Sequence, residues 1–352
     1  MREALASRDV LVLGREERLE AYRRHSMRHG ALLTRASIIK IGDTLDAAKV
    51  IHGTYEVTAP KPSEQQEEEE ARLRLRINAG ILDLKRLHKG PEFGEAGALD
   101  DLAGMVTHLS WQSLQFLAPK TAPSEQEFRK AHPAVRVDAI ESYIRGLMAA
   151  SPEQKHRFFT QAARLDEGFS QPCFQLGKMY AEKEDYRVAA GWLERVSRAD
   201  SRYLEARFLL GLSRYYLADY EGAAQCFEEV ARTVPLNEVL NNLGAAQLRN
   251  APDAAVENFR KALEGDNSDP DYHFNLGYAL WKTGNFTAAA DSFRAALERD
   301  EEDDEATTLL GRCLQESGPR PGETKVDSLE RLKAEYAEAA YRQLKAALGM
   351  PK

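Results

Sequence analysis

A Leu-Gly pair recurs at nearly even spacing through the second half of the chain. The pairs are Leu176-Gly177, Leu210-Gly211, Leu243-Gly244, Leu276-Gly277 and Leu310-Gly311. Their glycines follow one another at steps of 34, 33, 33 and 34 residues. A fixed period of this length is typical of stacked supersecondary units, none of which can bury its apolar face alone. The spacing therefore predicts a repeat architecture from residue 170 to about residue 318.

Length and charge limit what surrounds the repeats. The chain has 352 residues, enough for about two or three domains. Its net charge is −8, and the acidic residues are spread out except for a run at 67–70. Nucleic-acid partners usually need a clustered basic face, so we expect none here. The composition does not indicate an oligomeric state.

Cysteine usage and hydropathy bear on the compartment. Cys173, Cys226 and Cys313 are too few and too far apart for a disulfide framework, and we expect them to be buried thiols in repeat helices. No apolar run approaches the roughly 18 residues of a membrane span, so membrane insertion is not expected. The first six residues lack a hydrophobic signal segment. The sequence as it stands predicts a cytoplasmic location.

Residues 1–118 are predicted to form a small α/β domain. The expected order is a strand at 9–14, helices at 15–28 and 33–48, strands at 49–57 and 72–86, and a helix at 99–117. Residues 89–97, which contain three glycines and a proline, are predicted to be a turn region. Arginines alternate along the 72–86 strand; a polyanion site is one interpretation, and a solvated outer face is the favoured one.

Several short runs in this domain carry a resemblance. They are Thr-Arg-Ala-Ser at 34–37, Asp-Ala at 46–47 before the strand at 50–55, Leu-Asp-Leu at 82–84, and Asp-Asp-Leu at 100–102. Together, over about residues 8–118, they resemble a bacterial domain akin to the amino-terminal domain of TolB and to FlgO-like envelope proteins. In such domains a strand and a helix precede the segment that begins here at Asp9. If these elements are encoded upstream of Met1, the resemblance implies a periplasmic or cell-envelope location.

A proline-containing linker at residues 119–135 is predicted to join this domain to the repeat array at 136–318. Units are expected to start near residues 136, 170, 204, 237, 270 and 304, and the first of them is degenerate. The fold class is therefore α+β overall, and mostly α.

The repeated residues resemble tetratricopeptide repeats. The first helix of that pattern appears as Cys173, Leu176, Gly177 and Tyr180. The second helix has small, aromatic and small residues at Ala223/Phe227/Val230, Ala255/Phe259/Ala262 and Ala289/Phe293/Ala296. The resemblance implies about five to six helix pairs in a solenoid, with glycine and alanine allowing close approach of helix backbones.

Residues 319–352 are predicted to be a loop followed by a long C-terminal helix over about 328–348. Asp327 and Glu330 suggest a capping box, and Leu329, Leu332 and Tyr336 begin an apolar stripe that continues through Ala340, Leu344 and Ala347. Such a helix would cap the open end of the solenoid. The alternative is a docking helix for a second protein.

No catalytic motif was found. The sequence has no His-Glu-x-x-His, Gly-x-Ser-x-Gly or Walker loop, and its histidines make no metal-ligand spacing with the cysteines. We therefore expect a non-enzymatic protein without a cofactor or metal.

In tetratricopeptide arrays fixed positions of each first helix line the inner groove. The resemblance assigns these positions to Phe174, Lys178, Phe208, Leu212, Tyr215, Asn241, Leu248, Phe274, Tyr278, Trp281 and Arg312. An aromatic lining with a few polar anchors suits an extended or helical peptide. The alternative is that some of these aromatics pack on a neighbouring repeat or under the α/β domain. Asn242 and Asn275 match a position that some chaperone-binding relatives use for a peptide carboxylate, but the accompanying basic residues are incomplete, so that specificity is not expected.

The sequence thus predicts a non-enzymatic interaction scaffold that binds a peptide or protein segment in the concave groove. The alternative function is a bacterial cell-envelope or signalling module, in which the α/β domain senses a ligand and the repeats localise or relay.

Overall fold

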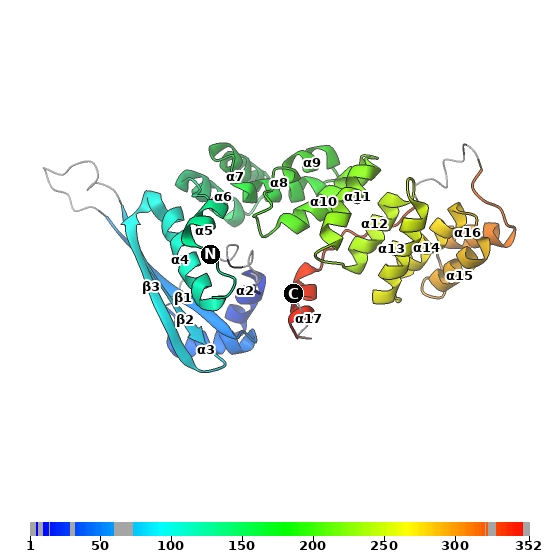
Figure 1. The fold of residues 1–352 in the computed structure, drawn as a ribbon. Helices are drawn as coiled ribbons and strands as arrows, with labels where there is room; N and C mark the ends of the chain where they lie inside the picture. Colours follow the sequence, from blue (N-terminus) through cyan, green and yellow to red (C-terminus); the bar gives the residue numbers. More distant parts are fainter. Residues whose placement is uncertain are drawn as a thin grey trace. The chain divides into compact units, whose positions relative to one another are not determined.

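The computed structural model describes residues 5, 10–13, 15–28, 32–59, 73–320, 322 and 329–347 (Figure 1). The chain divides into two compact units, residues 1–169 with 198–201, and residues 170–197 with 202–352. Within the described ranges no helix has the length and apolar character needed to cross a membrane. The fold class is the predicted one: mostly helical, with one small sheet near the amino terminus.

The first unit contains a three-stranded antiparallel sheet and seven α-helices among its described elements. These are α2 (Arg15–Arg24), α3 (Arg35–Thr44), β1 (Lys49–Thr58), β2 (Arg74–Asp83), β3 (His88–Ala98), a 3-10 turn (Leu99–Asp101), α4 (Leu102–Leu117), α5 (Glu125–Ala131), α6 (Val137–Met148) and α7 (Pro152–Leu165). The strand order is β1-β2-β3, and Ile51 pairs with Ile81 in the register of the first two strands.

Two predictions for this unit were wrong. Residues 89–97, expected to be a turn region, belong to β3. Residues 10–13, the described part of the expected first strand, form no strand. Val10 and Val12 instead pack beside the buried side chains of Leu114 and Phe128, where an apolar run is buried without strand pairing.

The glycines that suggested a turn instead allow close packing on β3. A Cβ at Gly97 would lie 3.4 Å from the Met105 sulfur of α4, and a Cβ at Gly90 would lie 3.0 Å from the Ile81 carbonyl oxygen. Pairing with β2 and cover by α4 therefore override low strand propensity. The proline in β3 is tolerated because this strand is at the edge of the sheet.

Helices α6 and α7 form a packed pair that resembles the later repeats. A Cβ added at Gly146 would lie 2.5 Å from the ring of Phe159, so the two helix backbones approach as closely as glycine allows. This contact agrees with the prediction of a degenerate repeat at 136–167, which stays a prediction.

The second unit is a row of helix pairs. Its elements are α8 (Ser170–Ala181), α9 (Tyr186–Leu193), α10 (Tyr203–Tyr216), α11 (Tyr220–Ala231), α12 (Asn237–Gln247), α13 (Pro252–Gly265), α14 (Pro270–Lys282), α15 (Phe286–Leu297), α16 (Asp304–Leu314) and α17 (Glu338–Ala347). From α8 to α15 consecutive helices pack as pairs, and each pair packs on the next (Figure 1).

The Leu-Gly pairs place glycine against the second helix of each repeat. A Cβ at Gly211 would lie 2.7 Å from the Phe227 ring, and one at Gly244 would lie 2.9 Å from the Phe259 ring. The predicted close approach is confirmed. Gly311 has no neighbour within 4 Å of such a Cβ, because no second helix follows α16 in the described residues.

Polar residues begin the second helices, as expected. The side chains of Asp185, Asp219 and Asn285 accept hydrogen bonds from the backbone N–H three residues ahead. Such N-caps satisfy donors that the first turn of a helix leaves free. The residue before each cap has positive φ, and at Gly284 (82°) glycine adopts it without strain.

The predicted capping helix is wrong in its bounds and place. Residues 329–337 form no helix, and α17 begins only at Glu338. Asp327, half of the expected capping box, lies outside the described residues, as do the side chains of Leu344 and Ala347. Leu329, Leu332 and Tyr336 do lie on an apolar core, but it is the core of the repeats and not the open end of the solenoid.

Candidate functional site

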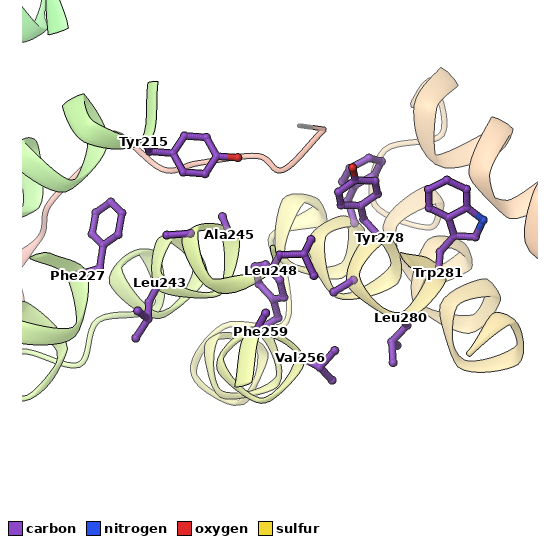
Figure 2. Packing of buried hydrophobic residues seen from close by; sticks show 14 of the residues in the cluster. Tyr215, Phe227, Leu243, Ala245, Leu248, Val256, Phe259, Tyr278, Leu280 and Trp281 are labelled. Carbon is purple, nitrogen blue, oxygen red and sulfur yellow. The ribbon is translucent and has the colours of Figure 1, made fainter. Parts of the chain in front are cut away.

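An extended segment of the chain lies across the first helices of the repeats. We call residues 329–337 the strap. Its hydrogen bonds and ion pairs reach α10, α12, α14 and the start of α16, and Figure 1 shows it running back along the row of helices. Figure 2 shows Tyr215, Tyr278 and Trp281 on one side of the stacked helices and Val256 and Leu280 on the other. The strap lies on the side that bears Tyr215.

Asparagine side chains bind the strap backbone. The Asn275 Nδ2 donates to the Arg331 carbonyl at 2.8 Å, and the Arg331 N–H donates to the Asn275 Oδ1 at 2.8 Å. Asn242 makes the same reciprocal pair with Lys333, again at 2.8 Å in both directions. Asn241 adds a third amide, which donates to the Arg331 carbonyl at 2.8 Å. Bonds to alternate residues are those that an extended chain offers to one partner face.

The three asparagines also bind one another. The Asn275 Nδ2 donates to the Asn241 Oδ1 at 2.7 Å, and the Asn241 Nδ2 donates to the Asn242 Oδ1 at 3.2 Å. All three residues are fully buried. Buried amides need partners for both ends of the dipole, so this network fixes their orientation toward the strap.

A basic pocket holds the strap carboxylate. The Glu330 side chain is 0% exposed and lies 2.9 Å from the Arg249 guanidinium. The Tyr215 hydroxyl donates to the same carboxylate at 2.9 Å. Burial beside this carboxylate raises the pKa of Tyr215 far above its usual value, so Tyr215 remains a hydrogen-bond donor.

An acidic pocket holds Arg331. The guanidinium makes two bonds to the Asp303 carboxylate, at 2.7 and 2.8 Å, and one to Glu305 at 3.1 Å. Its opposite face covers the Phe274 ring at 3.6 Å from the ring centroid. A planar cation held edge-on by a carboxylate and face-on by an aromatic ring favours arginine over lysine.

A second acidic pocket holds Lys333. Its ammonium lies 2.7 Å from Asp269 and 2.6 Å from Asp271, and it lies 5.3 Å from the Tyr272 ring centroid. Asp269 also caps α14, so the start of one helix supplies both carboxylates.

These ion pairs hold the charged forms of their members. Burial alone would raise the pKa of Asp303, but hydrogen bonds from Arg331 and from the Ala306 N–H leave it below its usual value. Burial alone would lower the pKa of Lys333, but Asp269 and Asp271 raise it above its usual value.

An aromatic contact completes the strap site. The Tyr336 ring stacks on Phe208 with centroids 5.1 Å apart, and the Ala337 N–H donates to Glu238 at 3.1 Å. Phe208 also packs edge-on against Phe227 of its own repeat. One ring thus serves both the repeat core and the strap.

The predicted lining residues divide into three groups. Phe208, Tyr215, Asn241 and Phe274 contact the strap. Leu212, Leu248 and Tyr278 are buried in the repeat core. Trp281 and Arg312 lie under the chain that follows α16, where they donate to the Ser317 and Gly318 carbonyls. Their role in binding a partner stays a proposal.

The last two predicted residues lie at the first repeat of the second unit. Phe174 is covered by the Arg202 guanidinium at 4.3 Å, and Lys178 lies 3.6 Å from Glu205. Neither has a described contact with the strap.

Sequence reasoning missed the charged half of the site. Arg249, Asp271 and Asp303 were not singled out, and the strap residues were assigned to a helix. The available signal was the alternation of Glu330, Arg331 and Lys333 in a segment that follows an array with acidic helix starts. Asn242 and Asn275 were noticed, but only for a carboxylate specificity; here they hold a main-chain amide instead.

The repeat region matches a known family. Residues 174–238, 208–270, 243–304 and 274–318 each match the model described as tetratricopeptide repeat. These residues are therefore tetratricopeptide repeats, as the sequence predicted. The matches begin at residue 174, so the resemblance of residues 8–118 to TolB and FlgO-like domains stays a prediction.

Solved structures of similar fold include two repeat proteins. One is MamA (residues 41 to the end) from Desulfovibrio magneticus RS-1, at 23% identity and a TM-score of 0.43, over 49% of this chain and 99% of that chain. Another is YrrB, described as a tetratricopeptide repeat protein with an unusual peptide-binding site, at 19% identity and a TM-score of 0.39, over 55% of this chain and 95% of that chain.

Proposed function

We propose that the repeat array is a non-enzymatic protein-interaction module that binds an extended protein segment on the face formed by its first helices. The observation that carries the proposal is the asparagine network. Asn242 and Asn275 each bind both main-chain groups of one residue, which recognises an extended backbone whatever its side chains.

The burial of these amides supports a binding role. A buried asparagine without partners is costly, because its amide is removed from water and gains nothing in return. The three asparagines bond to one another, but the Asn275 Oδ1 and the Asn242 Nδ2 are recorded only on strap atoms. The face is therefore built around an occupant, and the strap is the occupant that the structure shows.

The test converts the strap into a separable ligand. A specific protease site is placed at residues 319–326 of the full chain, between α16 and the strap, and the purified protein is cut. The dissociation constant of the released C-terminal fragment is then measured by fluorescence anisotropy after labelling the fragment.

We expect a measurable complex that is weakened at least ~100-fold by Asn242→Ala with Asn275→Ala, because four reciprocal hydrogen bonds are lost. The matched control is Asn258→Ala, which removes an asparagine that bonds Gln247 within the array. If the fragment leaves the unmutated protein and the double variant equally readily, the array does not use this face to bind extended chain.

A further inference from the structure

Each charged side chain at the start of the strap has its own pocket of opposite sign. Along the strap the order is Glu330, Arg331, Leu332, Lys333, and along the face it is a basic pocket, an acidic pocket and a second acidic pocket. Main-chain binding by asparagine does not require this matching. The pockets add a sequence preference to a site that could otherwise accept any extended chain.

The chemistry of the pockets is selective more than it is stabilising. Burying ion pairs costs desolvation that the attraction between the charges barely offsets, and apolar contacts would hold a permanent strap at least as well. A wrong charge in such a pocket, in contrast, leaves a desolvated charge unpaired. The Glu330 carboxylate, fully buried between Arg249 and Tyr215, would be the most sensitive position.

The arginine pocket is the most specific of the three. Asp303 meets the guanidinium edge with two bonds while Phe274 covers its face. A lysine ammonium at this position could make only a point contact and would not stack. The adjacent pocket, formed by Asp269 and Asp271, has no bidentate geometry and suits the compact ammonium of Lys333.

We infer that the partner of this face is a protein segment with the charge order of the strap: a carboxylate residue, an arginine, an aliphatic residue and a lysine, followed three residues later by an aromatic. The inference rests on the function proposed above. The strap occupies the site in the free protein, and a partner segment of the same chemistry replaces it.

The aromatic position sets the length of the recognised segment. Tyr336 stacks on Phe208, which lies on α10, whereas Arg331 reaches α16 through Glu305. The segment therefore spans four first helices, and a peptide shorter than the distance from Glu330 to Tyr336 would lose one end of the contact.

The test uses the full chain with Arg331→Ala and Lys333→Ala, which weaken the strap and leave every pocket intact. Two fluorescent peptides are compared by anisotropy: one with the sequence of residues 329–343, and one in which the glutamate and arginine at 330 and 331 are exchanged. Both peptides have the same composition and net charge.

We expect the exchanged peptide to bind at least ~30-fold more weakly, since two charges then face pockets of like sign. A double-mutant cycle between Asp303→Asn in the chain and Arg331→Ala in the peptide should give a coupling of at least ~10-fold. The cycle keeps the test valid if either single change alters binding through the fold, because such an effect cancels.

Three outcomes overturn the inference. Equal binding of both peptides, abolished by Asn242→Ala with Asn275→Ala, would leave the proposed function standing and remove the charge preference. Absence of binding by either peptide, together with a released fragment that does not rebind, would overturn the proposed function as well. Concentration-dependent dimerisation of the intact chain in sedimentation, lost with Arg331→Ala, would assign the site to the strap of a second copy.

Discussion

Replacing Asn275 with alanine tests how far the asparagine network holds the strap. The change removes three hydrogen bonds: two with the Arg331 backbone and one to the Asn241 side chain. Each is worth about 1 kcal/mol net, so docking of the strap should weaken by about 3 kcal/mol, or roughly 100-fold in its equilibrium constant. The loss cannot exceed the docking free energy itself, because the strap can leave instead of retaining unpaired groups.

Hydrogen exchange at the Lys333 amide is the readout. This N–H donates to Asn242 and not to Asn275, so the substitution does not touch its own bond. If the strap docks as one unit, its exchange should accelerate by roughly 100-fold with that of Arg331. Amides of α15, which do not contact the strap, should be unchanged.

Asn258→Ala serves as the control. Its side chain bonds Gln247 within the array, and no described bond joins it to the strap. An unchanged exchange rate at Lys333 in Asn275→Ala would refute the reasoning, since the strap would then be held without the network. Equal acceleration in both variants would show that the effect comes from loosening of the array.

Three other perturbations have defined outcomes. Since the pKa of Asp303 is held below its ordinary value of 3.8, its pair with Arg331 should persist above that pH and be lost as pH falls through the lowered pKa. Acid release of a labelled strap should therefore be less steep in Asp303→Asn than in the exposed control Asp304→Asn. Gly244→Ala should destabilise the array by about 1–3 kcal/mol in thermal unfolding, because the new methyl group meets Phe259, whereas Gly311→Ala should be neutral or stabilise by up to ~1 kcal/mol; equal losses would contradict the packing argument. Tyr336→Leu should weaken the released fragment by about 3–10-fold through loss of the stack on Phe208, and an unchanged affinity would remove this contact from the site.

The repeat array could be predicted because its determinants are local and recur. Gly211 meets Phe227 in the same way that Gly277 meets Phe293, so one period of sequence carries the whole contact. The caps behave likewise, since Asp219 needs only the N–H three residues ahead. The glycine-rich β3 was missed for the opposite reason: its strand character comes from pairing with β2, which a local pattern does not contain.

The strap could not be predicted because the same residues satisfy two patterns. Leu329, Leu332 and Tyr336 recur at helical spacing, and in the structure all three pack on the repeat core from an extended backbone. The backbone groups that a helix would pair internally are taken instead by Asn242 and Asn275. Contacts made about 60 to 90 residues away thus override a local preference, and a single sequence shows only the preference.

An occupied face changes what a measured affinity means. The strap follows α16 after about ten residues, and a tether of that length gives an effective concentration on the order of mM. If the free segment bound with a dissociation constant of about 10 μM, the face would be closed ~100-fold over open, and an equally good partner would show an apparent constant near 1 mM. A partner must then bind the pockets better than the strap does or be present in excess. Arg331→Ala in the chain, which opens the face while the pockets remain, should tighten partner binding; a variant that weakened it would show that the strap assists the partner and does not compete with it.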